Sequence, residues 1–203
     1  MRNVSHELLF MQTSPQYIDR MEAGELLAVA IQRRPEQPSL VLAISEKGAQ
    51  VALPLAETLG LPMGLMLVEP IVHPKDKSRE IGAVCELGCE AWDPGHGIHN
   101  DLLRFKAKKV ALESIRERRQ SGRPPLFVPS LERERVLIVT DGIASPLQVS
   151  LAIAVSQKRL SSEIWVASPV ASKESLLLIE ALADHVVCPL AVKELLSLDS
   201  HYA

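Results

Sequence analysis

Two kinds of apolar pattern alternate along the chain. In some segments apolar residues return every three or four positions, as on one face of a helix; in others they form short continuous runs, which are typical of buried strands. Helices are predicted over 17–34, 49–59, 100–120, 146–158 and 172–182. Strands are predicted over 39–44, 63–68, 81–87, 135–140, 163–167 and 185–188. This alternation predicts an α/β fold with a mostly parallel central sheet flanked by helices.

The polar segment 69–80 interrupts the alternation, and we expect a mobile loop there. Elsewhere no linker rich in proline, serine or glycine divides the 203 residues. One sizeable core can accommodate a chain of this length. The sequence therefore predicts a single domain.

Composition narrows the class of protein. Apolar residues make up 47% of the chain and charged residues 23%, as in soluble globular proteins. No run reaches the roughly 20 apolar residues of a membrane span, and the N-terminus lacks the order of a secretory signal. The cysteines Cys85, Cys89 and Cys188 are too few for a disulfide framework and are expected to be free thiols. We expect a cytoplasmic protein without a membrane partner.

The most informative segment is 136–148, where an apolar strand ends at Asp141 and a turn through Gly142 leads into a helix. Backbone N–H groups of such a turn, together with the positive end of the helix dipole, can hold a phosphate. A carboxylate at the end of the strand can accept hydrogen bonds from sugar hydroxyls. The pattern indicates a site for a sugar phosphate.

This segment resembles the phosphoribosyl pyrophosphate motif of type I phosphoribosyltransferases, in which an acidic pair precedes Gly-Ile-Ala-Thr-Gly-x-Thr. Similarity extends to 17–30, 81–84, 122–125 and 183–188. The resemblance implies a phosphoribosyltransferase-like fold with a flexible loop and a reduced hood. It also implies that the acids bind the ribose hydroxyls, that the following loop holds the 5′-phosphate, and that Mg²⁺ helps to hold pyrophosphate. The matching residues, which are expected to bind ligand, are Asp141, Gly142, Ile143 and Ala144.

The motif departs from the family in several places. Thr140 replaces the first acid, which leaves Asp141 as the expected catalytic residue. Ser145 can still donate a hydroxyl to phosphate, but Pro146 replaces a glycine and has no N–H. Gln148 replaces the last threonine, and with Ser145 it forms a capping-box pattern. Thr140, Ser145 and Gln148 are therefore candidate ligand-binding residues, or alternatively the start of a helix that caps itself.

A second loop, 42–49, aligns with the family's pyrophosphate loop. Gly48 is retained there, and Ser45 and Lys47 are further candidate ligand-binding residues. Glu46 stands where the family has an arginine, and its charge would repel pyrophosphate unless Lys47 compensates.

The segment 69–80 corresponds in position to the family's flexible catalytic loop. Its basic side chains could close over an anion, or the segment could be an ordinary solvated loop. These side chains are His73, Lys75, Lys77 and Arg79.

Four residues are of the types that bind zinc: Cys85, Cys89, His96 and His99. Their spacing fits no zinc motif. On one straight strand the two cysteines would lie roughly 13 Å apart, which is too far to share a metal. We therefore predict no metal held by protein ligands.

The predicted helix over 101–120 carries seven basic residues and three acidic ones. Such a helix can follow a nucleic-acid backbone, but Phe105 alone is available to stack on bases. The chain has a net charge of −3, which provides no general attraction to nucleic acid. Nucleic acid is therefore an unlikely partner, and a solvated helix face is favoured.

We divide the chain into an N-terminal extension, 1–16, a phosphoribosyltransferase-like domain, 17–192, and a C-terminal tail, 193–203. The extension contains an apolar patch at 8–11 that could be the contact of a homodimer. The tail retains Tyr202 where the nearest members of the family place several aromatic residues.

Two functional hypotheses follow from the altered loops. One is a divergent enzyme that displaces pyrophosphate from phosphoribosyl pyrophosphate, with Asp141 holding the ribose and Mg²⁺ required. The other is a non-catalytic relative that binds a nucleotide or phosphosugar as a sensor, or serves as a scaffold subunit. The departures at Thr140, Pro146 and Glu46 favour the second, because all three weaken binding of the same ligand.

Overall fold

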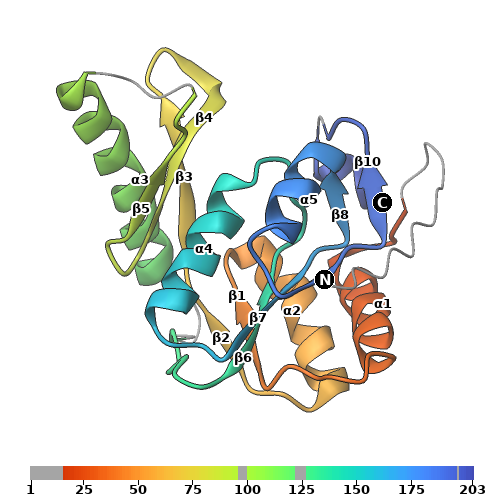
Figure 1. Cartoon of the computed structure of the whole chain (residues 1–203). Helices are drawn as coiled ribbons and strands as arrows, with labels where there is room; N and C mark the ends of the chain where they lie inside the picture. The colour runs from red at the N-terminus through yellow and green to blue at the C-terminus, as the bar shows by residue number, and fades with distance from the viewer. Residues whose placement is uncertain (1–15, 96–99, 122–126, 196) are drawn as a thin grey trace.

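The computed structural model describes residues 16–95, 100–121, 127–195 and 197–203, so nearly all of the N-terminal extension lies outside the described residues. At the centre is a five-stranded sheet in which every neighbouring pair is parallel, in the order β2-β1-β6-β7-β9 (Figure 1). These strands are β1 Leu40–Ala43, β2 Met63–Leu65, β6 Arg135–Val139, β7 Glu163–Ala167 and β9 His185–Val187. The predicted parallel sheet is confirmed.

Helices cover both faces of the sheet, because successive residues of a strand point to opposite sides. On one face α1 and α2 pack over residues such as Val41 and Val139, and on the other α4 and α5 pack over Leu42 and Ile138. The bounds are α1 Arg20–Gln32, α2 Glu46–Leu59, α4 Leu147–Lys158 and α5 Lys173–Glu180. All four helices are predicted by the sequence, with ends that differ by a few residues.

A smaller antiparallel sheet, in the order β3-β4-β5, stands beside the central one. It lies between α3 and α4 (Figure 1). Its apolar residues contribute to the hydrophobic cores on both faces of the central sheet. These elements are β3 Val68–His73, β4 Asp76–Cys85, β5 Glu90–Trp92 and α3 Asp101–Ser121. None of the helices in the described part of the chain is long and apolar enough to cross a membrane.

The prediction of a loop over 69–80 is wrong. These residues form most of β3, a turn at 74–75, and the first half of β4. Residues 75–79 are exposed, so this part of the hairpin has no buried stripe that a hydrophobic pattern could reveal. Backbone pairing orders it instead, with shifts in register on either side of Val72.

Several short elements are absent from the sequence prediction, because three residues are too few to show a period. They are β5 and the following three: β8 Val170–Ser172, β10 Leu190–Val192 and the 3-10 turn η1 Asp199–His201. β8 and β10 pair in parallel. Beyond them the chain returns to the start of α1, where Tyr17 and Tyr202 form a β-bridge and their ring centroids lie 5.8 Å apart.

The contact between α1 and α2 depends on Gly24. A Cβ atom at this position would lie 2.7 Å from Pro54 Cγ and closer still to the carbonyl oxygen of Val51. Backbone atoms cannot move aside as a flexible side chain can. Glycine therefore allows the two helices to approach this closely.

We expect Gly24→Ala to lower the free energy of unfolding by about 1–3 kcal/mol, because overpacking outweighs the helical preference of alanine. Urea denaturation measures the change. Gly95→Ala is the matched control, since the nearest atom to a Cβ there is 3.6 Å away. Equal stability of Gly24→Ala and the wild type would contradict the proposed role of Gly24.

Candidate functional site

The candidate site lies where β1 and β6 run side by side. From β1 the chain continues to β2 on one side, and from β6 it continues to β7 on the other. In open parallel sheets, ligands bind beyond the carboxyl ends of the strands at such a reversal of order. The first turn of α2 approaches the end of β6 closely there because Gly48 has no side chain: a Cβ would lie 3.1 Å from the carbonyl oxygen of Val139 and 3.2 Å from Thr140 Cα.

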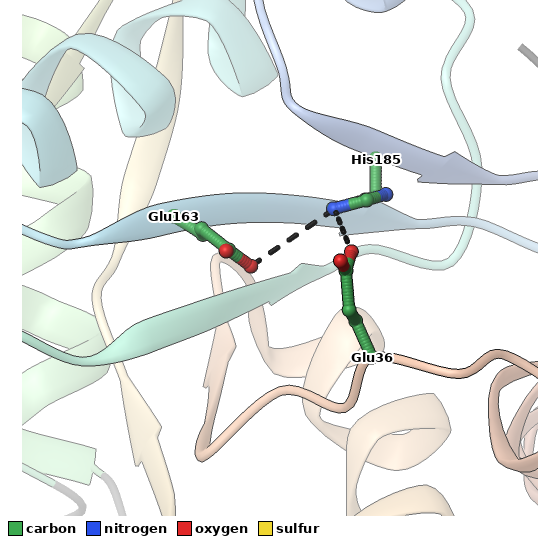
Figure 2. Close-up of side chains that lie close together, drawn as sticks. All are labelled: Glu36, Glu163 and His185. Carbon is green, nitrogen blue, oxygen red and sulfur yellow. Dashed lines mark ion pairs between the residues drawn. The ribbon is translucent and has the colours of Figure 1, made fainter. Parts of the chain in front are cut away.

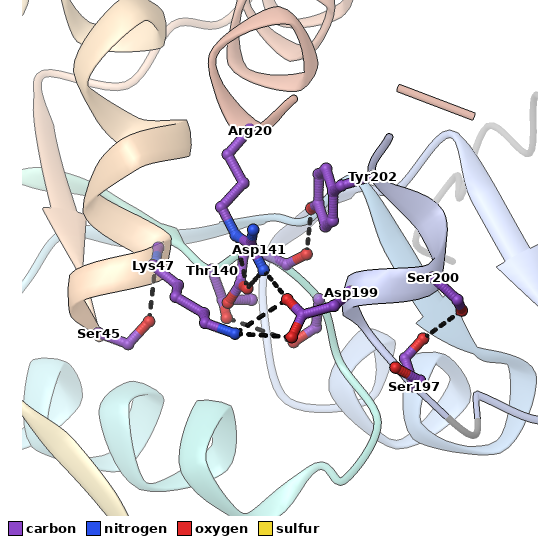
Figure 3. Close-up of polar contacts among 11 residues, drawn as sticks. Arg20, Ser45, Lys47, Thr140, Asp141, Ser197, Asp199, Ser200 and Tyr202 are labelled. Carbon is purple, nitrogen blue, oxygen red and sulfur yellow. Dashed lines mark hydrogen bonds and ion pairs between the residues drawn. The ribbon is translucent and has the colours of Figure 1, made fainter. Parts of the chain in front are cut away.

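Asp141, at the end of β6, is paired with Arg20 from the first turn of α1 (Figure 3). Its Oδ2 lies 3.1 Å from Arg20 Nε and 3.0 Å from Nη2. The Asp141 side chain is 7% exposed and that of Arg20 15%. The Tyr202 hydroxyl donates a hydrogen bond to the backbone carbonyl of Asp141. Asp141 is thus a buried carboxylate with its charge balanced inside the chain.

A second carboxylate reaches the site from the C-terminal segment. Asp199 lies 2.5 Å from Arg20 Nη2, and its two oxygens lie 2.9 and 3.0 Å from Lys47 Nζ (Figure 3). Hydrogen bonds from Lys47 and then Arg20 hold the pKa of Asp199 below its usual value. Burial would lower the pKa of Arg20, but the hydrogen bonds to Asp199 and Asp141 raise it overall. The site therefore brings two basic and two acidic side chains into direct contact.

The loop after β6 is tied into the fold. The Thr140 hydroxyl donates to the carbonyl of Gly142 at 3.3 Å. The Ile143 N–H donates to Val170, and the Ile143 carbonyl accepts from Ser172, at 2.9 and 3.0 Å. The carbonyl of Ala144 accepts a hydrogen bond from the Ser175 hydroxyl at 3.0 Å. These backbone groups join β6 to β8.

Ser145 and Gln148 do not form the predicted capping box. The cap position of α4 is Pro146, with no side-chain hydrogen bond, and Ser145 Oγ accepts only a long bond, 3.4 Å, from the Leu147 N–H. The side chains of Ser145 and Gln148 instead bind Glu80, which projects from β4. Burial raises the pKa of Glu80, and these two bonds only partly oppose the increase. Its Oε1 has no hydrogen-bond partner among the residues that the structure describes. The acidic group at the start of α4 is thus supplied by the chain itself.

The predicted loop 42–49 is mostly the end of β1 and the first turn of α2, and it supplies one cation to the site. Ser45 caps α2 by accepting the Gly48 N–H at 2.8 Å. Glu46 lies 3.1 Å from Arg118 of α3. Among the predicted residues of 42–49, Lys47 extends its charge to Asp199, as Figure 3 shows.

The predicted anion-binding residues of 69–80 belong to the β3–β4 hairpin. Lys75, Lys77 and Arg79 are exposed near its tip, and His73 Nδ1 accepts the N–H of Lys75 at 3.2 Å. A role for these side chains in closing over an anion stays a prediction.

His96 and His99, two of the four residues of zinc-binding type for which the sequence predicts no metal, lie outside the described residues. The apolar patch at 8–11 lies outside them as well. The two cysteines meet across a tight turn, with the Cys85 N–H donating to the Cys89 carbonyl at 2.9 Å. They are thus closer than they would be on a straight strand. Burial raises the pKa of Cys85, which favours the thiol over the thiolate that a metal requires.

Three potential metal ligands gather at the opposite edge of the sheet, at the amino ends of β7 and β9 (Figure 2). His185 Nε2 lies 3.3 Å from Glu36 and 3.9 Å from Glu163, and the His185 ring stacks on Trp165. The indole N–H of Trp165 donates to Glu163 at 3.4 Å. These are the contacts of an ion-pair cluster, and they lie away from the candidate site.

Basic residues of α3 are largely engaged within the chain. Arg118 lies 3.1 Å from both Glu46 and Glu69, Arg119 pairs with Glu86, and Lys108 pairs with Glu90. Arg104 lies over the ring of Trp92 at 4.2 Å. A main role of these charges is therefore to hold α3 against the smaller sheet.

No model of a known protein family matches the sequence. Two proteins from strains of Mycobacterium tuberculosis, each described as a putative phosphoribosyl transferase, are 26% identical to it over 176 residues. The match covers 84% of this chain and 39% of each relative, so the chain spans well under half of their length.

Among solved structures, the protein TT1426 from Thermus thermophilus is 26% identical, covers 92% of this chain and 90% of its own, and has a TM-score of 0.72. Adenine phosphoribosyl transferase from Trypanosoma brucei covers 90% of this chain and 66% of its own, with 10% identity and a TM-score of 0.51. The chain has a phosphoribosyltransferase-like fold. The resemblance to phosphoribosyltransferases that the sequence indicated is thereby confirmed.

In this phosphoribosyltransferase-like fold, sequence reasoning found Asp141 and Lys47 but missed Arg20, Glu80 and Asp199. Arg20 gives a faint signal, because a cation in the first turn of a helix opposes the helix dipole and needs an anionic partner. Glu80 and Asp199 lie in polar segments without a pattern. Their role is visible only in the folded chain.

We expect Glu80→Gln to stabilise the protein at neutral pH by about 1 kcal/mol. The raised pKa means that the folded chain binds the proton of Glu80 more tightly than the unfolded chain, where the ordinary value is 4.5. The stability this proton contributes is complete below that value and is lost as pH rises through the raised pKa. Glutamine stays neutral, so its advantage should appear above about pH 5 and vanish below about pH 4.

Urea denaturation between about pH 4 and pH 8 tests this expectation. Glu132→Gln is the control, because it makes the same change of charge at an exposed position. If Glu80→Gln were the less stable protein at neutral pH, the Glu80 charge would have to be stabilising, contrary to its raised pKa.

Proposed function

We propose that this chain binds phosphoribosyl pyrophosphate or a nucleotide at the carboxyl ends of β1 and β6. The observation that carries the proposal is the position of Asp141. It lies at the reversal point of a phosphoribosyltransferase-like sheet and is paired with Arg20, which shares the Asp199 carboxylate with a second cation, Lys47. A carboxylate suits ribose hydroxyls, and an adjacent pair of cations suits phosphate.

The class of ligand has support from the structural comparison. The Trypanosoma brucei adenine phosphoribosyl transferase, which shares the fold, was crystallised with AMP, pyrophosphate and ribose-5-phosphate. The segment around Asp141 resembles the family motif for ribose and its 5′-phosphate. A phosphorylated ribose is therefore the ligand that we assign to this site.

We further propose that binding, and not phosphoribosyl transfer, is the main activity. Thr140 provides a hydroxyl that already bonds to Gly142, in place of a second carboxylate. Pro146 has no N–H to offer to phosphate, and Ser145 is engaged with Glu80. Each of these features removes a group that would stabilise the charge that develops during phosphoribosyl transfer.

Magnesium does not fit a site made of these protein groups. Mg²⁺ prefers several oxygen ligands, including one or two carboxylates. The two carboxylates present, Asp141 and Asp199, are both bound by Arg20, so a cation already lies between them. In this proposal Mg²⁺ accompanies the ligand's own phosphates.

The test is calorimetric titration of phosphoribosyl pyrophosphate with Mg²⁺. We expect micromolar binding to the wild type, and at least about tenfold weaker binding to Asp141→Asn, because the amide accepts and donates differently at the ribose hydroxyls. Asp101→Asn is the control, since Asp101 is an exposed acid at the start of α3.

Release of pyrophosphate is measured in the same samples with adenine, guanine, hypoxanthine and uracil as acceptors. Binding without release supports the proposal in full. Rapid release of pyrophosphate would overturn only the proposal that binding, and not transfer, is the main activity. Absence of binding would overturn the proposal that the chain binds phosphoribosyl pyrophosphate.

A further inference from the structure

The cation pair Arg20 and Lys47 is occupied in the free chain by Asp199. The Asp199 carboxylate bridges the two side chains. Its Oδ1 lies 2.5 Å from Arg20 Nη2, and its Oδ1 and Oδ2 lie 2.9 and 3.0 Å from Lys47 Nζ. A phosphate group presents oxygens to paired cations in a similar arrangement. The Asp199 carboxylate therefore stands where a phosphate oxygen of a ligand would be held.

We infer that Arg20 and Lys47 form a subsite for a phosphate or pyrophosphate group, and that Asp199 of the C-terminal segment is an internal competitor for it. The inference rests on the proposed function, since it assigns part of the same site. It assigns to Arg20 a contact with ligand. It also assigns to residues 197–203 a function beyond packing against the start of α1.

The segment is built so that Asp199 can leave while the side chain of Tyr202 stays attached. Tyr202 is buried, its hydroxyl bonds to the Asp141 carbonyl, and its ring lies 4.4 Å from the Arg20 guanidinium. The Asp199 side chain, in contrast, is 64% exposed and that of Lys47 is 55% exposed. Ligand can thus reach the ion pair from solvent without unpacking Tyr202.

Leu198 adds a second contact that covers the loop after β6. It packs against Gly142, where a Cβ would collide with the Leu198 side chain. The short turn η1 and the residue before it therefore carry both an anion over the cation pair and an apolar group over the predicted phosphate loop. Opening of this turn would uncover both parts of the site together.

Competition of this kind lowers the apparent affinity, because only chains with Asp199 displaced can bind. A partly exposed ion pair of this type accounts for about a fivefold change in an equilibrium constant. Asp199→Asn should therefore bind phosphoribosyl pyrophosphate and inorganic pyrophosphate about fivefold more tightly than the wild type.

Glu194→Gln is the matched control, because it removes one negative charge from an exposed position five residues before Asp199 in sequence. Its affinities should stay within about twofold of the wild type. Adding Lys47→Ala to Asp199→Asn should abolish the gain, whereas adding Lys193→Ala should not. Thermal melting verifies that each variant is folded.

The outcomes separate this inference from the proposed function. If phosphoribosyl pyrophosphate binds but Asp199→Asn gains no more than Glu194→Gln, the inference fails and the proposed function stands. If only inorganic pyrophosphate binds, and Asp199→Asn improves it, the proposed function fails and the subsite stands. If neither compound binds any variant, both are overturned.

Hydrogen exchange of the wild type provides a test without substitution. The N–H groups of His201 and Tyr202 donate to Leu198 and Asp199 within this turn, both at 3.2 Å. Saturating pyrophosphate should open the turn and accelerate exchange of these two amides. Unchanged exchange in the saturated protein would contradict the displacement of Asp199.

Discussion

The guanidinium of Arg20 lies between two carboxylates, and the arrangement of the site depends on it. It connects α1 to the end of β6 through Asp141 and to the C-terminal segment through Asp199. A buried carboxylate without a partner is costly, so Asp141 can remain at the end of a buried strand only with such a cation nearby. The ring of Tyr202 over Arg20 strengthens the same junction.

This junction also changes the charges at the candidate site of the phosphoribosyltransferase-like fold. Two of the chain's own acidic groups lie where anions would be expected: Asp199 on the cation pair and Glu80 at the start of α4. In our proposal a ligand exchanges with Asp199 instead of entering a vacant site. Such exchange would make binding dependent on the C-terminal segment, which lies beyond the loops of the motif.

The sequence was sufficient to predict the helices and strands in which apolar residues follow a clear pattern. The strands and helices of the central sheet, from β1 to α5, follow from runs of buried residues such as those around Val41 and Ile138. It failed for the β3–β4 hairpin, because residues 75–79 are exposed and their order comes from backbone pairing. It also misread Ser145 and Gln148, whose local pattern favours a capping box but whose side chains find Glu80 instead.

The sequence by itself determined the alternation of strands and helices, and with it the location of Asp141 at the carboxyl end of a buried strand. Only the tertiary structure decided the partners of the charges. Arg20 and Asp141 are 121 positions apart in sequence, and Lys47 and Asp199 are 152 apart. Periodicity reports which face of an element is buried, whereas ion pairs depend on which distant side chains the fold brings within a few ångströms.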